Sequence, residues 1–347
     1  MNKAATIALA PFGALYSAAV KVRSTGYEKQ FLKSHTVAAP VISVGNITVG
    51  GTGKTPLVQW AARRLAESGR RVCILTRGYR RENTKQRVVV SDGEQILSDV
   101  IQSGDEAMML AQALLGKASV VCDVDRVAGA QWAIENLNAE VLLLDDGFQH
   151  RRLARDLDIV TIDASNPFGN GRLLPAGILR EPINNLSRAD CIVLTRVAHG
   201  AEPKLIERIR QATNAPIMES RTVIERVCQL DGSEVGVDAF ARQPVAAFCG
   251  IGNPRAFFKQ LCSANFDVRH TTAFRDHQKY SQSDIDRISD HAKAKGAQAL
   301  TTTAKDAVKL QELNFDLPCY VAEIELELSD TPGLLDLIGQ AIAKKTK

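Results

Sequence analysis

The sequence predicts an α/β protein with a doubly wound, mostly parallel sheet of the P-loop type, a second and smaller α/β domain, and an N-terminal apolar helix. Apolar strand-like runs alternate with helix-like segments along the first two thirds of the chain. One such run continues into a glycine-rich turn at residues 41–56 (VISVGNITVGGTGKTP), and the alternation resumes beyond residue 237. Alternation of this kind is typical of parallel sheets covered by helices.

The first α/β domain is predicted over residues 36–218. Its helix at 54–68 places Leu57, Ala61 and Leu65 on one face, and Gly69 follows as a stop signal. The predicted strands are short apolar runs at residues 41–45, 71–76, 119–122, 141–145, 157–162 and 190–195.

A change of pattern at residues 216–236 predicts the connection between two domains. The run alternates strand-like residues and ends in a DG turn signal. The smaller domain is predicted to hold strands at 244–249, 266–270, 298–302 and 318–325 and helices at 254–264, 281–295 and 304–312. A terminal helix at 330–346 could pack on either domain. The predicted division is an N-terminal region at 1–35, a P-loop-type domain at 36–218, a linker at 219–236, and a smaller domain with the C-terminal helix at 237–347.

Composition excludes several classes of protein. The chain has 347 residues, of which 45% are hydrophobic, so it can build a sizeable core. A formal net charge of +4 does not indicate a nucleic-acid partner. Seven widely spaced cysteines without a CxxC pair indicate buried thiols in a reducing compartment, not disulfides or a zinc site.

The glycine-rich turn follows a strand and precedes a helix, which is the arrangement that cradles phosphate groups. Its glycines let backbone N–H groups converge on phosphate oxygens, and the helix directs its positive end at the anion. Lys54 would reach the β- and γ-phosphates, and Thr55 would place its hydroxyl on Mg²⁺. The consensus G-x-x-x-x-G-K-[ST] is missed only at its first glycine, which falls on Thr48. The predicted nucleotide-binding residues are Thr48, Val49, Gly50, Gly51, Thr52, Gly53, Lys54 and Thr55; the alternative is a glycine-rich turn without a ligand.

The N-terminal segment from Ala4 to Val20 carries no charge and is followed directly by Lys21 and Arg23. It is shorter than the ~20 apolar residues of a transmembrane span, and Pro11 interrupts it. A secretory signal is disfavoured because a nucleotide-type loop follows. We predict a helix that dips into the cytoplasmic face of a membrane, with the basic residues of 70–87 facing anionic headgroups. The alternative is a helix simply packed on the domain.

Three acidic positions and one histidine are candidates for chemistry. Asp145 and Asp146 end an apolar strand, where P-loop proteins place the acid that supports magnesium; the alternative is a pair of turn-capping aspartates. Asp105, in SGDEAMML, and His277, in FRDHQKY, are the candidates to accept a hydroxyl proton. By themselves, helix capping for Asp105 and a surface position for His277 are the better interpretations.

Eight motifs, taken in order, closely resemble the tetraacyldisaccharide 4'-kinase family, the lipid A 4'-kinases of Gram-negative bacteria. The resemblance runs from the N-terminal segment to about residue 325, and its DDGFQH and GNITVGGTGKTP blocks are far more specific than a bare P-loop. The family's departure from the consensus also accounts for Thr48. The motifs are VGNITVGGTGKTP, LTRGYRR, SGDEAMML, LLLDDGFQH, GRLLPAGILREP, FCGIGNPRAFF, FRDHQKYS and TTAKDAVKL.

The resemblance implies a membrane-associated kinase that moves the γ-phosphate of ATP to the 4'-hydroxyl of a tetraacylated glucosamine disaccharide 1-phosphate, giving lipid IVA at the cytoplasmic face of the inner membrane. Matched motif by motif, Lys54 and Thr55 bind phosphate and Mg²⁺, and Asp145 or Asp146 supports the metal. The implied roles of the remaining matched residues are a further metal contact for Glu181, the catalytic base for Asp105, and the partner of that base for His277.

Two arginines are predicted to bind the substrate. Arg77, in TRGYRR, and Arg126, in CDVDR, could hold the 1-phosphate or nearby headgroups through forked hydrogen bonds. The alternative is a pair of surface arginines or helix-end ion pairs. Lys305 and Asp306, in TTAKDAVKL, could line the nucleotide side of the cleft, although an ordinary N-capped helix explains them as well.

Rival functions are weaker. A membrane-recruited ATPase switch of the partitioning type needs a lysine where this sequence has Val49, and a GTPase needs an N-K-x-D motif that does not occur. A kinase of a soluble sugar would not need the uncharged segment 4–20. The expected partners are the lipid substrate and a membrane surface, with no nucleic acid, and the chain is expected to be a monomer.

Overall fold

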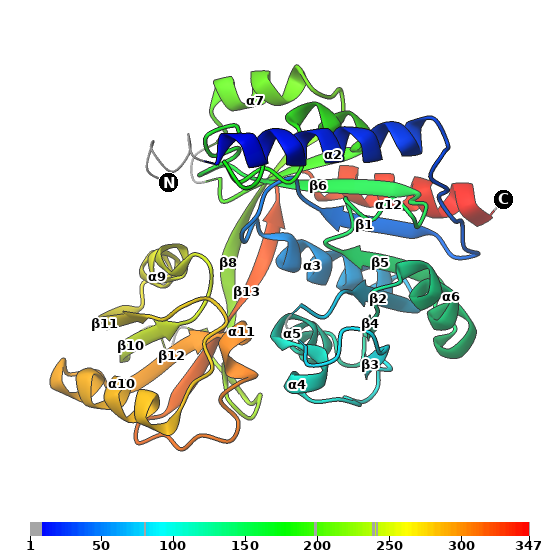
Figure 1. Cartoon of the computed structure of the whole chain (residues 1–347). Helices are drawn as coiled ribbons and strands as arrows, with labels where there is room; N and C mark the ends of the chain where they lie inside the picture. Colours follow the sequence, from blue (N-terminus) through cyan, green and yellow to red (C-terminus); the bar gives the residue numbers. More distant parts are fainter. Residues whose placement is uncertain (1–8, 80, 198–199, 238–239, 241, 347) are drawn as a thin grey trace.

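The protein consists of two α/β units joined by two long strands, as Figure 1 shows. The computed structural model describes residues 9–79, 81–197, 200–237, 240 and 242–346. We call the part built on strands β1–β7 the larger unit and the part built on β10–β12 the smaller unit. The prediction of an α/β fold with a mostly parallel sheet is confirmed.

In the larger unit the predicted strands are present, and each begins and ends within one residue of its predicted limits. They are buried because they are continuous apolar runs covered on both faces. The elements of this unit are α2 (Ala10–Glu28), β1 (Val41–Gly45), α3 (Lys54–Glu67), β2 (Val72–Thr76), β3 (Val88–Ser91), α4 (Val100–Ser103), α5 (Asp105–Ala113), β4 (Ala118–Cys122), α6 (Arg126–Leu137), β5 (Val141–Asp145), β6 (Leu157–Asp163), the 3₁₀ helix η1 (Ile183–Arg188), β7 (Cys191–Thr195) and α7 (Pro203–Arg210).

The second half of the chain forms the connecting strands, the smaller unit and a terminal helix. The predicted helix 281–295 begins with a reciprocal cap in which Ser281 and Asp284 bond each other's backbone N–H. The predicted helix 304–312 is one turn long and ends at Ala307. The elements are β8 (Ile217–Gln229), β9 (Glu234–Val235), β10 (Pro244–Cys249), α9 (Pro254–Ser263), β11 (Asp267–Ala273), α10 (Gln282–Ala294), β12 (Ala299–Thr303), α11 (Ala304–Ala307), β13 (Cys319–Leu328) and α12 (Thr331–Thr346).

One sheet runs through both units. Its strand order is β11-β10-β12-β13-β8-β7-β6-β1-β5-β2-β4-β3, with β9 paired to β8. The strand before the glycine turn, β1, lies between β5 and β6 and is parallel to both. The edge strand β3 was not predicted; it pairs antiparallel with β4 and is only half-buried. β3 is a four-residue strand (VVVS) whose first two residues are only partly buried, and the prediction overlooked its run of three valines.

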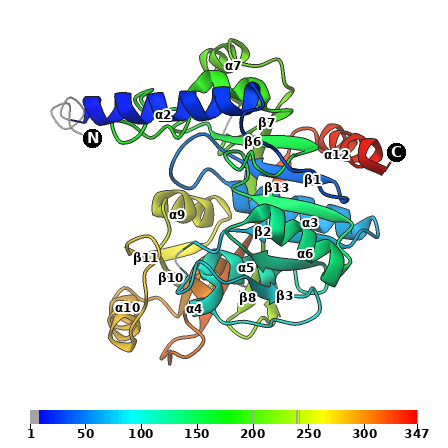
Figure 2. The same ribbon diagram turned by 45° about the vertical axis from the view of Figure 1, so that its right-hand side comes forward.

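The predicted linker at 219–236 is largely a strand. Residues 217–219 of β8 pair in parallel with β7, and from residue 220 onward β8 pairs antiparallel with β13. Both views show β8 and β13 passing together from one unit to the other (Figures 1 and 2). The connection is therefore a two-stranded ribbon that belongs to the sheet on both sides.

The two faces of the larger sheet are covered by different helices. Residues of α3, α5 and α12 pack on one face, whereas residues of α6, η1 and α7 pack on the other. The predicted helix face of Leu57, Ala61 and Leu65 is buried here. The terminal helix α12, which the predicted division assigned to the smaller domain, packs on the larger unit instead, because β13 leads the chain back there.

Helix α2 lies against the larger unit along one side. The Tyr16 hydroxyl donates to the backbone oxygen of Arg180 over 3.1 Å, and a Cβ on Gly13 would stand 3.2 Å from that of Ala176. Phe12, Leu15 and Val22 point away from the unit and are 62–72% exposed. Residues 4–8 of the predicted apolar segment lie outside the described residues. Within the described part of the chain, no helix combines the length and the apolar character that crossing a membrane requires.

The packing of α12 yields the first prediction. Ile338 is 2% exposed in the core of the larger unit, whereas Leu335, one turn earlier, is 37% exposed. Ile338→Ala should lower the free energy of unfolding by about 2–5 kcal/mol because it leaves a cavity. The control Leu335→Ala should cost less than about 1 kcal/mol. Denaturant unfolding followed by the fluorescence of Trp60 and Trp132 measures both, and equal effects would contradict the packing described here.

Candidate active site

The glycine turn after β1 is fixed by hydrogen bonds from Asn46 within the turn and from side chains of β6 and β7. The Asn46 amide donates to the Thr52 hydroxyl over 2.9 Å, and that hydroxyl lies 2.9 Å from the hydroxyl of Thr161. The Thr195 hydroxyl donates to the backbone oxygen of Thr52 over 2.9 Å. Gly53 caps α3 with φ +76°, and a Cβ there would approach Thr195 to 3.1 Å. The turn is therefore preformed, with the positive end of α3 directed at its mouth.

The outer side of the turn is open. Thr48 bridges to Leu179, and the Val49 N–H donates to the backbone oxygen of Ile178 over 2.8 Å. Beyond these anchors, Val49, Gly50 and Gly51 are exposed. An anion that approached the turn would meet backbone N–H groups without having to displace a side chain.

Lys54 faces the acidic end of β5. Its ammonium lies 3.3 Å from Asp146 Oδ1, and Arg180 binds Asp146 Oδ2 over 2.7 Å. Asp145 is buried beside Asp146 and accepts a hydrogen bond from the Thr76 hydroxyl over 3.2 Å. The predicted juxtaposition of Lys54 with the two strand-end aspartates is present in the structure.

The two aspartates differ in their ionisation. Burial raises the pKa of Asp145 to about 6, and the carboxylates of Glu106 and Asp146 add to the shift. Burial acts in the same direction on Asp146, but the positive charges of Lys54 and Arg180 outweigh it and lower the pKa of Asp146 to about 2. At neutral pH both groups are ionised, and Asp146 carries the more strongly stabilised charge.

The other two predicted metal ligands are placed differently. Thr55 follows Lys54 in the first turn of α3, at the mouth of the glycine turn. The Glu181 carboxylate is buried and accepts hydrogen bonds from Asn185 over 2.7 Å and Arg188 over 2.8 Å. Thr55 therefore lies next to Lys54 at the start of α3, whereas the charge of Glu181 is already balanced by Arg188. Over the described residues, no three His, Cys, Asp or Glu side chains are grouped so that they could hold a metal by themselves.

Asp105 and His277, 172 residues apart, meet across the two units. His277 Nδ1 lies 2.8 Å from Asp105 Oδ2 and 3.0 Å from Asp105 Oδ1. Asp105 begins α5 after Gly104, whose φ of +84° and close approach to the backbone of Tyr79 leave no room for a side chain. The Tyr79 ring lies 5.6 Å from that of His277. This pairing was implied by the resemblance and not by the local pattern of either segment.

Two lysines of the smaller unit complete the surroundings of Asp105. Lys305 lies 3.1 Å from Glu106 Oε1, and Lys309 lies 3.9 Å from Asp105 Oδ2. Burial acts to raise the pKa of Asp105, but the hydrogen bond from His277 and the charges of Lys305 and Lys309 together lower it. Asp105 is therefore a carboxylate at neutral pH.

Sequence reasoning missed Lys309 and underestimated Asp306. Asp306 is fully buried and accepts hydrogen bonds from the Gly250 N–H over 3.0 Å, from Tyr280 over 3.0 Å and from Lys309 over 2.9 Å. It also accepts a bond from Thr303, so it orients much of the wall that faces Asp105. The three-residue spacing of Asp306 and Lys309 was the only signal available in the sequence.

The arginines predicted to bind the substrate lie at the carboxyl ends of neighbouring strands. Arg77 follows β2 and is exposed, whereas Arg126 begins α6 and is buried, and its guanidinium donates to the backbone oxygen of Asp123. Burial lowers the pKa of Arg126 to about 10, so it remains charged at neutral pH. Both arginines add positive charge around His150. They share one edge of the sheet with the glycine turn, and their role in binding the substrate stays a prediction.

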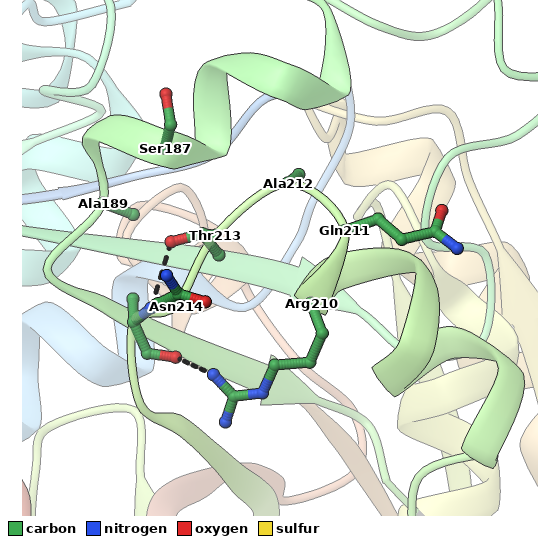
Figure 3. A pocket seen from close by; sticks show the side chains of 8 residues that line it. Ser187, Ala189, Arg210, Gln211, Ala212, Thr213 and Asn214 are labelled. Atoms are coloured by element: carbon green, nitrogen blue, oxygen red, sulfur yellow. Dashed lines mark hydrogen bonds between the residues drawn. The ribbon is translucent and has the colours of Figure 1, made fainter.

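A pocket elsewhere on the larger unit has no connection with these residues (Figure 3). It lies at the amino ends of β7 and β8, opposite the edge that carries the glycine turn. Arg210 in its wall already donates to the backbone oxygen of Ala215 over 2.6 Å. The lining residues are Ser187, Ala189, Arg210, Gln211, Ala212, Thr213, Asn214 and Ala215.

A helix terminus prepared for an anion, with a carboxylate nearby that can take a proton, provides both halves of phosphoryl transfer to a hydroxyl. The fold and the site therefore define an enzyme of the kinase class. Comparison with known proteins identifies the family within this class.

The profile of the tetraacyldisaccharide-1-P 4'-kinase family matches residues 5–343. The chain is 39% identical to the tetraacyldisaccharide 4'-kinase of Halothermothrix orenii, covering 94% of this chain and 90% of the relative. It is 39% identical to that of Chlorobium phaeovibrioides, covering 96% and 98%. A crystal structure of LpxK from Aquifex aeolicus in complex with ATP superimposes with a TM-score of 0.79 at 35% identity, covering 97% of this chain and 99% of that one. The chain belongs to the tetraacyldisaccharide 4'-kinase family.

The surroundings of His150 yield a prediction about pH. Burial lowers the pKa of His150 to about 4 from its ordinary value of 6.5, and the charges of Arg126, Arg77 and Arg23 add to the shift. Because the folded pKa is the lower one, the unfolded chain takes up this proton first, and stability is lost as the pH falls from about 6.5 to 4. His150→Gln should remove up to about 3 kcal/mol of that loss.

Denaturant unfolding of the wild type and of His150→Gln between pH 4 and 7.5 measures this difference. His35→Gln, at an exposed position, is the control and should follow the wild type. A pH dependence that is unchanged in His150→Gln would show that folding does not lower the pKa of this imidazole.

Proposed function

We propose that this chain transfers the γ-phosphate of ATP to the 4'-hydroxyl of a tetraacyldisaccharide 1-phosphate, giving lipid IVA. The observation that carries the proposal is the hydrogen bond between Asp105 and His277, which joins the two units beside the edge that bears the glycine turn. A nucleotide hydrolase without an acceptor would not need a proton acceptor assembled from two units. Membership of the family supports the same acceptor.

The glycine turn would hold the nucleotide. Backbone N–H groups of residues 48–55 other than that of Val49, which bonds to Ile178, would bind the phosphate oxygens, and Lys54 would leave Asp146 to reach the β- and γ-phosphates. The 3.3 Å ion pair of Lys54 with Asp146 keeps the ammonium oriented toward the turn until an anion with more charge arrives. In this interpretation ATP binding exchanges one partner of Lys54 for another.

The residues present fit a magnesium ion. The Thr55 hydroxyl and the carboxylates of Asp145 and Asp146 offer only oxygen, which Mg²⁺ prefers, and it commonly uses one or two carboxylates together with phosphate oxygens. When bound, the ion would neutralise charge on the transferring phosphoryl group. Glu181 is a poor ligand because Asn185 and Arg188 already satisfy its carboxylate.

Asp105 would orient the sugar hydroxyl and accept its proton as the new oxygen–phosphorus bond forms. His277 would hold the carboxylate in place, since its Nδ1 lies within 3.0 Å of both carboxylate oxygens. Arg77 and Arg126 would bind the 1-phosphate at the same edge, where their charges match it. The expectation of a monomer stays a prediction.

Transfer of labelled phosphate from ATP, with Mg²⁺, to the disaccharide 1-phosphate in mixed detergent micelles tests this function. Asp105→Asn keeps the shape of the side chain but removes its charge, so kcat should fall by about 10²- to 10⁴-fold. Asp99→Asn is the matched control, because Asp99 is an exposed N-cap of α4 and asparagine caps equally well. ATP consumption without labelled lipid would indicate an ATPase switch, and full activity of Asp105→Asn would remove Asp105 from the mechanism.

We propose further that α2 attaches the enzyme to the cytoplasmic face of the inner membrane. The helix packs on the larger unit through Gly13 and Tyr16, and its opposite side exposes Phe12, Leu15 and Val22, with Phe31 (81% exposed) just beyond its end. An apolar face above basic residues suits an anionic membrane surface. In this proposal one side of α2 packs on the larger unit and the other side contacts the membrane, so each of the two interpretations of the N-terminal segment applies to one side of the helix.

Flotation with vesicles that contain anionic lipid measures this attachment. Replacing Phe12 and Leu15 together by serine should weaken binding at least tenfold, because the buried apolar area is lost. A matched control replaces Leu97 and Ile101, which are 52% and 65% exposed elsewhere on the larger unit. Unchanged binding of the Phe12 and Leu15 variant, or an equal loss in both variants, would contradict the role of α2.

A further inference from the structure

Lys305 is the group that lies within hydrogen-bond distance of the outer nitrogen of His277, Nε2, at 3.4 Å; the Asp276 carboxylate lies farther from Nε2, at 3.8 Å. The Lys305 ammonium also lies 3.1 Å from Glu106 Oε1 and 3.2 Å from Asp276 Oδ1. Glu106 belongs to the larger unit, next to Asp105, while the other two partners belong to the smaller unit. The lysine side chain is 15% exposed. Because Lys305 contacts Nε2 and Asp105 contacts Nδ1, the two residues lie on opposite sides of the imidazole ring.

The hydrogen-bonding capacity of an ammonium constrains what it can meet. Lys305 carries three N–H donors and no acceptor, and the structure gives it three partners. Two of these partners are carboxylates, which accept. The third, His277 Nε2, can take part only if it presents a lone pair.

The other side of the ring is constrained in the opposite sense. Asp105 is a carboxylate and offers only lone pairs to His277 Nδ1, 2.8 Å away. The tautomer with hydrogen on Nε2 would set N–H against the lysine and a lone pair against the carboxylate. The doubly protonated ring would set N–H against the ammonium. Only the tautomer with hydrogen on Nδ1 satisfies Asp105 and Lys305 together.

We propose that Lys305 is a positioning residue that selects the Nδ1–H tautomer of His277 and so keeps the imidazole a hydrogen-bond donor to Asp105. This inference rests on the proposed role of Asp105. It gives His277 the task of orienting the carboxylate, because its second nitrogen is occupied by an ammonium that cannot accept a proton. The contact of Lys305 with Glu106 of the larger unit also ties the tautomer to the contact between the two units.

The tautomer can be measured without reference to activity. In the full chain labelled with ¹⁵N-histidine, the imidazole ¹⁵N shifts separate protonated from unprotonated nitrogens, and loss of one pair of signals in His277→Asn assigns that residue among the six histidines. We expect hydrogen on Nδ1 and a lone pair on Nε2 in the wild type. In Lys305→Met, Nε2 should become protonated in at least half of the molecules.

Kinetics provide the second measurement. Lys305→Met should lower kcat by about 10- to 100-fold, as expected for a misplaced catalytic group, while the KM for ATP changes less than about threefold. Lys305→Arg, which also only donates, should recover at least half of the wild-type kcat. The control Lys293→Met removes an exposed lysine of the smaller unit that pairs with Asp316 and should match the wild type.

Hydrogen on Nε2 in the wild type would overturn the inference, as would an unchanged tautomer or an unchanged kcat in Lys305→Met. The wild-type spectrum decides even if Lys305→Met does not fold. The two proposals fail separately: an active Asp105→Asn with the expected His277 spectrum would remove the base but leave the lysine's effect on the ring intact.

Discussion

The antiparallel pairing of β8 with β13 is the constraint on which the rest of the structure depends. The ladder runs from residue 220 to 229 on one strand and from 328 to 320 on the other, and it is the path by which the sheet continues from one unit to the next. Arg63 of α3 holds the ribbon from the side through Glu225, 3.4 Å away. Because the carboxyl ends of β2, β5 and β12 reach the gap between the units, residues from both sides meet there. The contact of Asp105 with His277 is a consequence of that geometry.

Charge balance explains why so many ionised groups can be buried at this meeting point. A buried carboxylate is costly unless it is paired and hydrogen-bonded. Asp105 faces an imidazole and two lysines, and Asp306 accepts four hydrogen bonds. At the other end of the cluster, Asp146 faces Lys54 and Arg180. Asp105 and Asp146 therefore each have a cation from another segment, whereas Lys309 lies only three residues after Asp306. The ion pairs of Asp105 and Asp146 form only when those segments are in place.

Local pattern was enough to predict β1, the glycine turn and the face of α3, because strand, turn and helix signals all lie within a few residues of one another. It also predicted the strand-end aspartates. The run of three valines in β3 was overlooked, and the pattern was not enough for α12, whose apolar face fits either unit. The roles of Glu181 and Lys309 depend on partners that the fold supplies. Arg188 pairs with Glu181, and Asp306 and Asp105 orient Lys309. Side-chain contacts of this kind have no signature in the spacing of residues.

The ribbon of β8 and β13 also determines how the smaller unit is inserted into the chain of the larger one. The chain leaves the larger unit at Glu219 and returns at Ser329, and these residues bond each other: the Ser329 N–H donates to the Glu219 backbone oxygen over 2.8 Å. After Ser329, the chain goes on to α12, so that α2 and α12, the first and last helices of the described residues, both lie with the larger unit (Figure 1). The smaller unit is thus an insertion whose entry and exit are neighbours. An insertion whose two ends are adjacent can change in length and sequence during evolution without changing the strand order of the larger unit.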